Sequence, residues 1–183
     1  MPLEDTVGLI VVVLVAVFIG GLMVGRTPEY LRKRIGFGEM RWVVVYALIP
    51  PTVILACTGI ALAFDDGRTS MGNPGAHGLT ELIYAYTSNT NSNGSAMAGF
   101  NGATDFHNLL MVVAMPAGRY LPMVAVLALA GRLARQQPGV VTVGTLRAQG
   151  VNFVVLATAA AVILALLNFL PALSLGTIAD GLL

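Results

Sequence analysis

The sequence has few charged residues, one cysteine and no motif for nucleotide binding or catalysis. Charged residues make up 10% of the chain and hydrophobic residues 56%, with a mean hydropathy of +0.81. Soluble domains carry about 25% charged residues, so this composition favours an integral membrane protein. Cys57 is the only cysteine, which excludes a disulfide framework. Without a phosphate-binding loop, an aspartyl-phosphate motif, a catalytic triad or a basic run, we expect no catalytic residue, organic cofactor or nucleic-acid partner.

Long apolar segments are abundant. A helix of about 20 apolar residues crosses the roughly 30 Å hydrocarbon core of a bilayer. Segments of this kind occupy residues 7–25, 42–64, 106–131 and the inner part of 148–179, about 151–170. The sequence therefore predicts an all-α integral membrane protein with about four transmembrane helices. Pro50-Pro51 interrupts the second segment, but membrane helices tolerate proline where neighbours satisfy the freed backbone groups.

The basic residues are concentrated in two loops between these segments. Of the ten, all but Arg68 and Arg119 lie there, and they are Arg26, Arg32, Lys33, Arg34, Arg41, Arg132, Arg135 and Arg147. The positive-inside rule places both loops in the cytoplasm. The amino terminus, the region between the second and third segments and the carboxyl terminus are then predicted to lie outside.

That external region, residues 65–105, contains a helical pattern too short to cross a membrane. It follows the Asn73-Pro74-Gly75 breaker, covers about 78–88 and continues into a run of small polar residues, 87–95. One interpretation is an inert surface hairpin. The other is a re-entrant pore half-helix followed by a filter loop, and these residues alone leave both open.

The pore interpretation has a clear chemical basis. A half-helix directs the partial negative charge of its carboxyl end at a cation, and backbone carbonyls in the following loop can replace the cation's water shell. Gly94 would allow left-handed backbone angles, and Ser92, Asn93 and Ser95 would hold the loop by hydrogen bonds. One such loop cannot enclose an ion, because filters are rings of about four.

Two further polar residues, Arg119 and Glu81, are candidates for function, whereas the two histidines are not. Arg119, in the middle of the third apolar segment, either extends to the membrane surface or faces a water-filled pore, and the cost of mid-membrane burial favours the pore. Glu81 is either a solvated residue of the half-helix or an attractive charge near the pore mouth. His77 and His107 have no cysteine or carboxylate cluster at ligand spacing, so we interpret them as interfacial polar residues.

Several motifs resemble the A chain of the potassium-transporting Kdp ATPase, the KdpA family. They are Gly25-Arg26-Thr27-Pro28-Glu29-Tyr30-Leu31, Asn73-Pro74-Gly75 with His77-Gly78, Asn93-Gly94-Ser95-Ala96 with Ala98-Gly99, Gly118-Arg119, and Phe169-Leu170-Pro171-Ala172-Leu173. The resemblance covers essentially the whole chain but only the carboxyl-terminal third of the family. The sequence departs from the family's pattern at Ser92, where asparagine is usual, and at Asn89-Thr90, where small alanines are usual.

The resemblance implies a four-repeat fold related to potassium channels, with a K⁺-channel-like repeat of span, half-helix, filter loop and span. Residues 1–25 would end the third repeat, and 42–131 would form the fourth. The implied segments are cytoplasmic loop 26–41, span 42–64, pore half-helix 78–88, filter loop 89–99, span 106–131, cytoplasmic loop 132–150 and terminal transmembrane helix 151–175. The filter would be Asn91, Ser92, Asn93, Gly94 and Ser95, with K⁺ at the carbonyls of Ser92, Asn93 and Gly94. Arg119 matches the family's pore arginine, and Glu81 is the second predicted pore-lining residue.

The implied function is that of a potassium-binding and translocating subunit without ATPase activity of its own. It would select extracellular K⁺ and pass it to the P-type ATPase B chain in the inner membrane of a bacterium or archaeon. Further implied partners are the C chain, the small F peptide, the remaining repeats of the A chain and membrane lipid. The alternative is a non-conducting scaffold or truncated remnant that contacts the ATPase chain without transporting.

Overall fold

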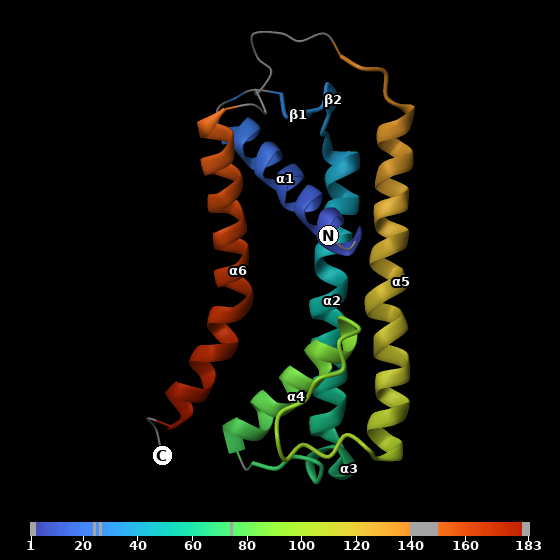
Figure 1. Ribbon diagram of the computed structural model, residues 1–183, viewed down its shortest axis with the longest axis vertical. Coiled ribbons are helices and arrows are strands. Elements are labelled where there is room, and N and C mark those ends of the chain that lie inside the picture. The colour runs from blue at the N-terminus through green and yellow to red at the C-terminus, as the bar shows by residue number, and fades with distance from the viewer. Residues whose placement is uncertain (1–2, 24, 26, 74, 140–149, 181–183) are drawn as a thin grey trace. The chain divides into compact units, whose positions relative to one another are not determined.

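The computed structural model describes residues 3–23, 25, 27–73, 75–139 and 150–180. This part of the chain is mostly helical (Figure 1). Its elements are α1 (Leu3–Met23), β1 (Glu29–Tyr30), β2 (Lys33–Arg34), α2 (Phe37–Ala63), α3 (Asp65–Arg68), α4 (Gly75–Thr90), α5 (Asp105–Arg135) and α6 (Val151–Asp180). Arg26, Arg147 and residues 140–149, which the sequence places in cytoplasmic loops, lie outside the described residues.

Among the residues that the structure describes, two helices are long and apolar enough to cross a membrane. They are α2 and α5, of 27 and 31 residues, or about 40 and 46 Å at 1.5 Å per residue. Within the described residues, α1 and α6 contain shorter apolar segments, Val7–Met23 and Val151–Ile163. The predicted membrane helices are thus supported at α2 and α5, and the total of about four stays a prediction. Pro50 and Pro51 lie inside α2, and Pro116 and Pro122 inside α5.

A short β-hairpin departs from the all-helical expectation. Glu29 pairs with Arg34 and Tyr30 with Lys33 in antiparallel register. The turn residues, Leu31 and Arg32, both have positive φ, 50° and 63°, which is the backbone of a two-residue type I′ turn. The hairpin lies in the predicted cytoplasmic loop 26–41.

The chain divides into two compact units, of which the first comprises Met1–Val45 and Ala125–Asn168. In this unit the end of α5 is fastened to the hairpin region. Arg132 Nε lies 3.3 Å from the Glu39 carboxylate, which also accepts a hydrogen bond from the Gly36 N–H at 3.0 Å. Lys33 donates to the Leu133 carbonyl, and the Gln136 amide donates to the Arg34 carbonyl at 3.1 Å.

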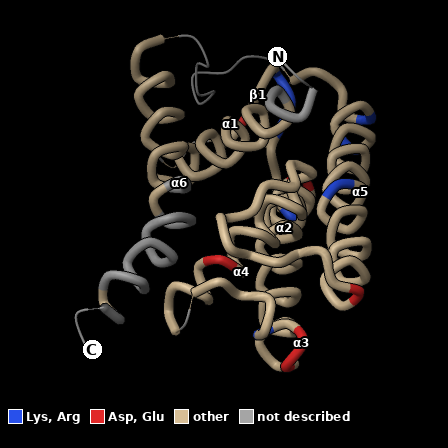
Figure 2. Tube along the Cα trace, turned by 60° about the horizontal axis from the view of Figure 1, so that its bottom comes forward, with Lys and Arg blue, Asp and Glu red and all other residues tan. Residues whose placement is uncertain are grey.

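The second unit comprises Tyr46–Val124 and Phe169–Leu183. Its core contains Cys57 and Ala61 of α2, Leu82 and Tyr86 of α4, and Ala114 of α5. The acidic residues of its described part are on α3, on α4 and at the start of α5 (Figure 2). This unit contains the candidate site.

Candidate functional site

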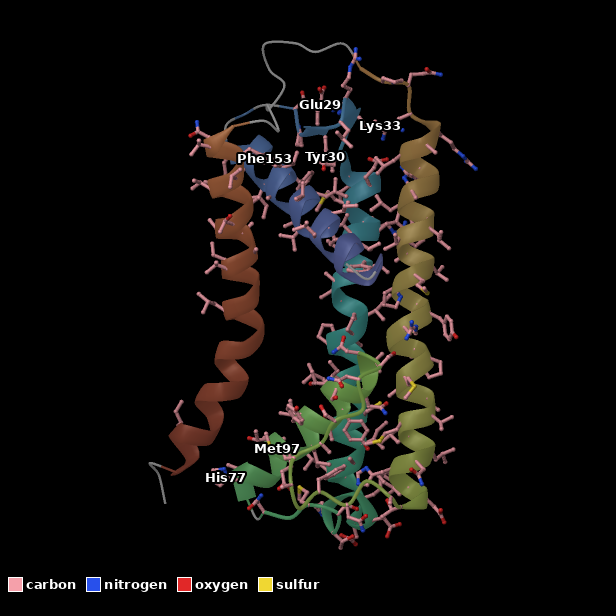
Figure 3. All side chains as sticks on the ribbon, viewed as in Figure 1. Glu29, Tyr30, Lys33, His77, Met97 and Phe153 are labelled. Carbon is pink, nitrogen blue, oxygen red and sulfur yellow. The ribbon has the colours of Figure 1, made fainter. Side chains whose placement is uncertain are left out.

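The short helix α4 is the framework of the site. It begins at Gly75 rather than residue 78 and continues through Thr90 rather than ending at 88. Its 16 residues give a length of about 24 Å, still less than the roughly 30 Å of a bilayer core. Leu82 and Tyr86 are fully buried in the core formed with α2 and α5, so packing on two long helices fixes the direction of α4. Figure 3 shows His77 in its first turn and Met97 on the loop beyond its end.

The carboxyl end of α4 closes with a Schellman-type turn. The Ser92 N–H donates to the Asn89 carbonyl at 2.8 Å, and the Asn93 N–H donates to the Ser88 carbonyl at 2.9 Å. These are the two bonds of that motif, in which the residue after the cap takes a left-handed backbone, usually as glycine. Here the residue is Ser92, with φ of 60°.

Gly94 also has a left-handed backbone, with φ of 80°. The left-handed angles predicted for this residue are therefore confirmed. A β-carbon built at Gly94 would meet no atom of the described chain within 4 Å, so the requirement for glycine arises from the backbone angle. The Gly94 N–H donates to the Ser88 carbonyl at 3.3 Å.

Ser88 is the residue that holds the loop to the helix. Its hydroxyl accepts a hydrogen bond from the Ser95 N–H at 2.8 Å and lies 2.9 Å from the Ser95 hydroxyl. The Tyr84 hydroxyl lies 3.1 Å from the same Ser95 oxygen. The predicted anchoring by Ser95 is confirmed, but the sequence did not single out Ser88 or Tyr84. Their spacing, which places them on one helix face, was the available signal.

A pocket of about 300 Å³ lies beside this loop. Its walls come from α4, the loop and the start of α5, and its lining includes Asn89, Gly94, Ser95, Phe100, Asn108 and Met111. The Asn89 side-chain oxygen is buried and has no hydrogen-bond partner within the described residues. The lining combines the polar side chains of Asn89, Ser95 and Asn108 with the apolar ones of Phe100 and Met111.

Arg119 lies in α5 next to a residue that touches the end of α4. A β-carbon built at Gly118 would lie 2.3 Å from the Thr90 carbonyl oxygen, so this glycine allows the close approach of the two helices. Arg119 is thus the residue that follows the contact between α5 and the carboxyl end of α4. The Arg119 residue itself is exposed.

Glu81 and His107 have surroundings that the sequence did not predict. Glu81 is 1% exposed, so the solvated alternative for this residue is wrong. His107 is 0% exposed, so the protein surrounds its side chain, and the predicted interfacial position of His107 stays a prediction. Its Nδ1 lies 2.7 Å from the Tyr86 hydroxyl.

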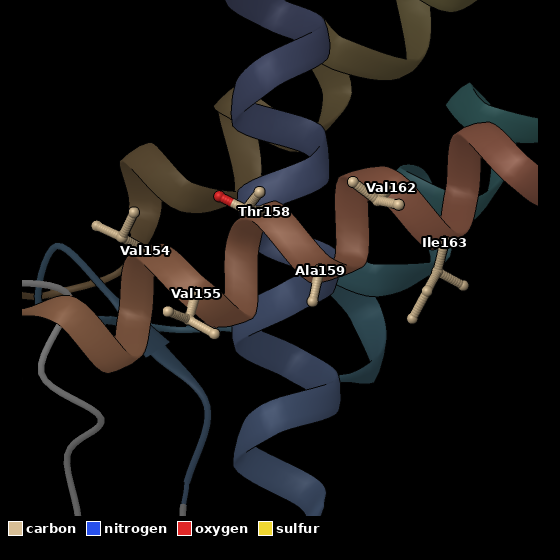
Figure 4. Close-up of a pocket in the computed structure, with 6 residues that line it drawn as sticks. All are labelled: Val154, Val155, Thr158, Ala159, Val162 and Ile163. Carbon is tan, nitrogen blue, oxygen red and sulfur yellow. The ribbon is translucent and has the colours of Figure 1, made fainter.

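A second, larger pocket contributes nothing to this arrangement. It has a volume of about 450 Å³ and is lined by one face of α6, with Val154, Val155, Thr158, Ala159, Val162 and Ile163 (Figure 4). All of these side chains except Thr158 are aliphatic. Thr158 supplies the one side-chain oxygen among these six residues.

Comparison with known proteins gives one consistent result. The family model described as "Potassium-transporting ATPase A subunit" (KdpA) matches residues 5–182. Proteins named "Potassium-transporting ATPase potassium-binding subunit" from Streptomyces coelicolor, Streptomyces griseus and Laribacter hongkongensis are 51%, 49% and 47% identical to the chain. Each match covers 96% of this chain and 31% or 32% of the relative. The chain thus spans about a third of the length of these relatives, and it belongs to the KdpA family, the A subunits of potassium-transporting ATPases.

Proposed function

We propose that the chain is the carboxyl-terminal portion of a potassium-binding and translocating subunit, which selects extracellular K⁺ and passes it to a P-type ATPase subunit. The observation that carries this proposal is the end of α4, a helix too short to cross a bilayer that closes into a loop with left-handed Ser92 and Gly94. The relatives' name, potassium-binding subunit, supports K⁺ as the ion. ATP hydrolysis then belongs to the partner subunit.

The backbone of the loop suits a site made of carbonyl oxygens. The N–H groups of Ser92, Asn93 and Gly94 all donate back to carbonyls of α4, so these donors are satisfied within the protein. The carbonyls of the same three residues replace part of the water shell of K⁺. The partial negative charge at the carboxyl end of α4 stabilises the ion further.

The proposed site is one quarter of a ring. Asn91 and Ser95 flank its carbonyls, and the other repeats of the subunit supply the facing loops. Arg119 is the proposed pore arginine, and the close approach of its neighbour Gly118 to Thr90 supports this role. The pore-mouth role of Glu81 stays a prediction.

The proposed partners are the ATPase B chain, the C chain, the F peptide and lipid, in a cell membrane with the filter loop outside.

Replacement of Gly94 by alanine tests the site. A β-carbon penalises the left-handed backbone by about 1–2 kcal/mol, so apparent K⁺ affinity of the assembled complex should fall by about tenfold. Discrimination against Rb⁺ or Na⁺ should weaken too, measured as ion-stimulated ATPase activity. Gly102→Ala is the control, because Gly102 has no left-handed backbone and a β-carbon there would meet only the Phe100 ring edge, at 3.2 Å. Equal K⁺ affinity and selectivity in wild type and Gly94→Ala would reject the filter.

The chain's share of its relatives' length, about 32%, leaves the scaffold function as a second candidate. Expressed alone, the chain should insert in the membrane and fail to support growth at low potassium, because one loop leaves the ion largely uncoordinated. Co-expression with the missing repeats and the ATPase subunit should restore growth under the transport proposal. A complete, correctly assembled complex that binds ATP but moves no K⁺ would favour the scaffold.

A further inference from the structure

Glu81 lies near the middle of α4, yet its carboxylate bonds to the segment that precedes the helix. One oxygen accepts hydrogen bonds from the backbone N–H groups of Gly72, at 2.8 Å, and of Asn73, at 3.4 Å. The other accepts a hydrogen bond from the Asn73 side-chain amide. With 1% exposure, Glu81 is a buried acceptor with three donors on one short segment.

That segment lies directly against the chain that leaves the proposed filter. The Asn101 N–H donates to the Ser70 carbonyl at 2.9 Å. A β-carbon built at Gly72 would lie 2.9 Å from the Gly99 carbonyl carbon, so the two backbones touch. Residues 70–72 therefore form a support for residues 99–101.

The segment that bonds to Glu81 also packs on the first turns of α4. A β-carbon built at Gly78 would lie 2.6 Å from the Asn73 carbonyl oxygen and 2.7 Å from the Met71 sulfur. Glu81 is on the next turn of the same helix and fixes this segment by its side chain. The filter loop is thus held at residues 93–95 by Ser88 and, where the chain leaves the loop, by the segment to which Glu81 bonds.

We propose that Glu81 is a positioning residue for potassium selectivity, an inference that rests on the proposed function. It sets the place of residues 99–101 through Gly72 and Asn73, and so limits how far the carbonyls of the filter loop can move. A buried donor that loses its acceptor costs free energy, and the segment can avoid that cost only by moving toward water. Such movement would loosen the loop without removing any atom that touches the ion.

Two single variants and one double variant test this role in the complete complex. Glu81→Met keeps a long side chain but removes every acceptor, and Asn73→Asp places one carboxylate against another. In the double variant Asn73→Asp/Glu81→Gln, the amide introduced on α4 can donate to the carboxylate introduced at position 73, while its oxygen accepts from the two backbone N–H groups. We expect each single variant to raise the K⁺ concentration for half-maximal ATPase activity by at least about tenfold, which is the effect of one buried group left without its partner. The maximal rate should stay near wild type, and the Rb⁺-to-K⁺ activity ratio should rise.

The double variant should restore half-maximal K⁺ concentration and ion preference to within about threefold of wild type. Asp66→Asn, at an exposed carboxylate nearby, should change neither quantity. Normal K⁺ dependence and ion preference in both single variants, or a double variant as impaired as Asn73→Asp, would overturn the inference. If the complex with Glu81→Met does not assemble, the comparison between Asn73→Asp and the double variant Asn73→Asp/Glu81→Gln decides the test. If Gly94→Ala alters K⁺ affinity while these variants do not, the inference fails and the filter assignment stands.

Discussion

Ser92 adopts a backbone conformation in which a serine is strained. Its φ of 60° places the backbone of Ser92 in the left-handed region. Glycine is unstrained there, and asparagine occurs there more often than serine. Ser92→Gly or Ser92→Asn should therefore raise the free energy of unfolding of the complex, by about 0.5–1 kcal/mol. Thermal unfolding of the purified complex in detergent measures this change as an increase in the midpoint temperature.

The opposite change at the same position is the control. Ser92→Val introduces a β-branched side chain, which is a clear outlier at positive φ, and should lower the midpoint temperature. If valine, glycine and asparagine all gave the wild-type midpoint, the left-handed turn after α4 would be absent from the assembled protein.

The sequence predicts the backbone conformation of one site residue, but not the hydrogen-bond partners of two others. Gly94 was identifiable because a glycine within a run of polar residues indicates an unusual backbone, and its φ of 80° agrees. Glu81 was a candidate too, but the bonds of Ser88 and Glu81 could not be predicted, because their partners follow or precede them across a turn. Ser88 bonds to Ser95 and Glu81 to Gly72 only once the chain has reversed direction. Helix periodicity describes which residues share a face, but it does not say where a loop returns.

Between elements, one buried hydrogen bond joins α4 to α5. The Tyr86 hydroxyl and His107 Nδ1 are 2.7 Å apart, both residues are 0% exposed, and the rings of Phe100 and Phe106 pack edge-on against the imidazole. Tyr86→Phe would leave a buried imidazole nitrogen without its partner. We expect this variant to lose about 1–3 kcal/mol of unfolding free energy, again measured by thermal unfolding of the complex.

Tyr84→Phe provides the matched control. This variant also removes a tyrosine hydroxyl, two residues earlier in α4. The Tyr84 side chain is exposed and its hydroxyl lies 3.1 Å from Ser95, so the loss of unfolding free energy should be less than about 0.5 kcal/mol. Equal losses in Tyr86→Phe and Tyr84→Phe would mean that the α4–α5 bond contributes no special stability. Removing both partners, in Tyr86→Phe/His107→Leu, should cost less than the sum of the two single changes.

Long elements were easier to predict than short ones. Continuous apolar segments gave the places of α2 and α5, and proline did not end either helix. The bounds of α4 were too narrow because its last residues, Asn89 and Thr90, are polar and are held by packing. The β1–β2 hairpin had no sequence signal at all, since type I′ turns usually carry Asn-Gly and this one carries Leu31-Arg32. Hydrogen bonds from the segment after α5 hold it instead, such as those from the Gln136 amide to the Arg34 carbonyl at 3.1 Å and from the Gly139 N–H to the Arg32 carbonyl at 2.7 Å.

For the whole molecule, the distribution of charge predicts orientation in the membrane. The described basic residues of the first unit include Arg32, Lys33 and Arg34 around the hairpin and Arg132 and Arg135 at the end of α5. In the second unit, α3 carries Asp65 and Asp66. Because positively charged loops are retained in the cytoplasm, the hairpin and the end of α5 should lie inside, and α3 should lie outside with the filter loop.

Accessibility of single cysteines tests this orientation directly. In a background in which the buried Cys57 is replaced by alanine, Gln137→Cys should react with a membrane-impermeant maleimide only after the cells are opened. Thr69→Cys should react in intact cells. Both positions are exposed, whereas Gly67 beside the second is buried and has no room for a side chain. The cysteine-free background should show no labelling in either condition. Labelling of Gln137→Cys from outside intact cells would invert the orientation, and K⁺ would then meet the proposed filter from the cytoplasmic side.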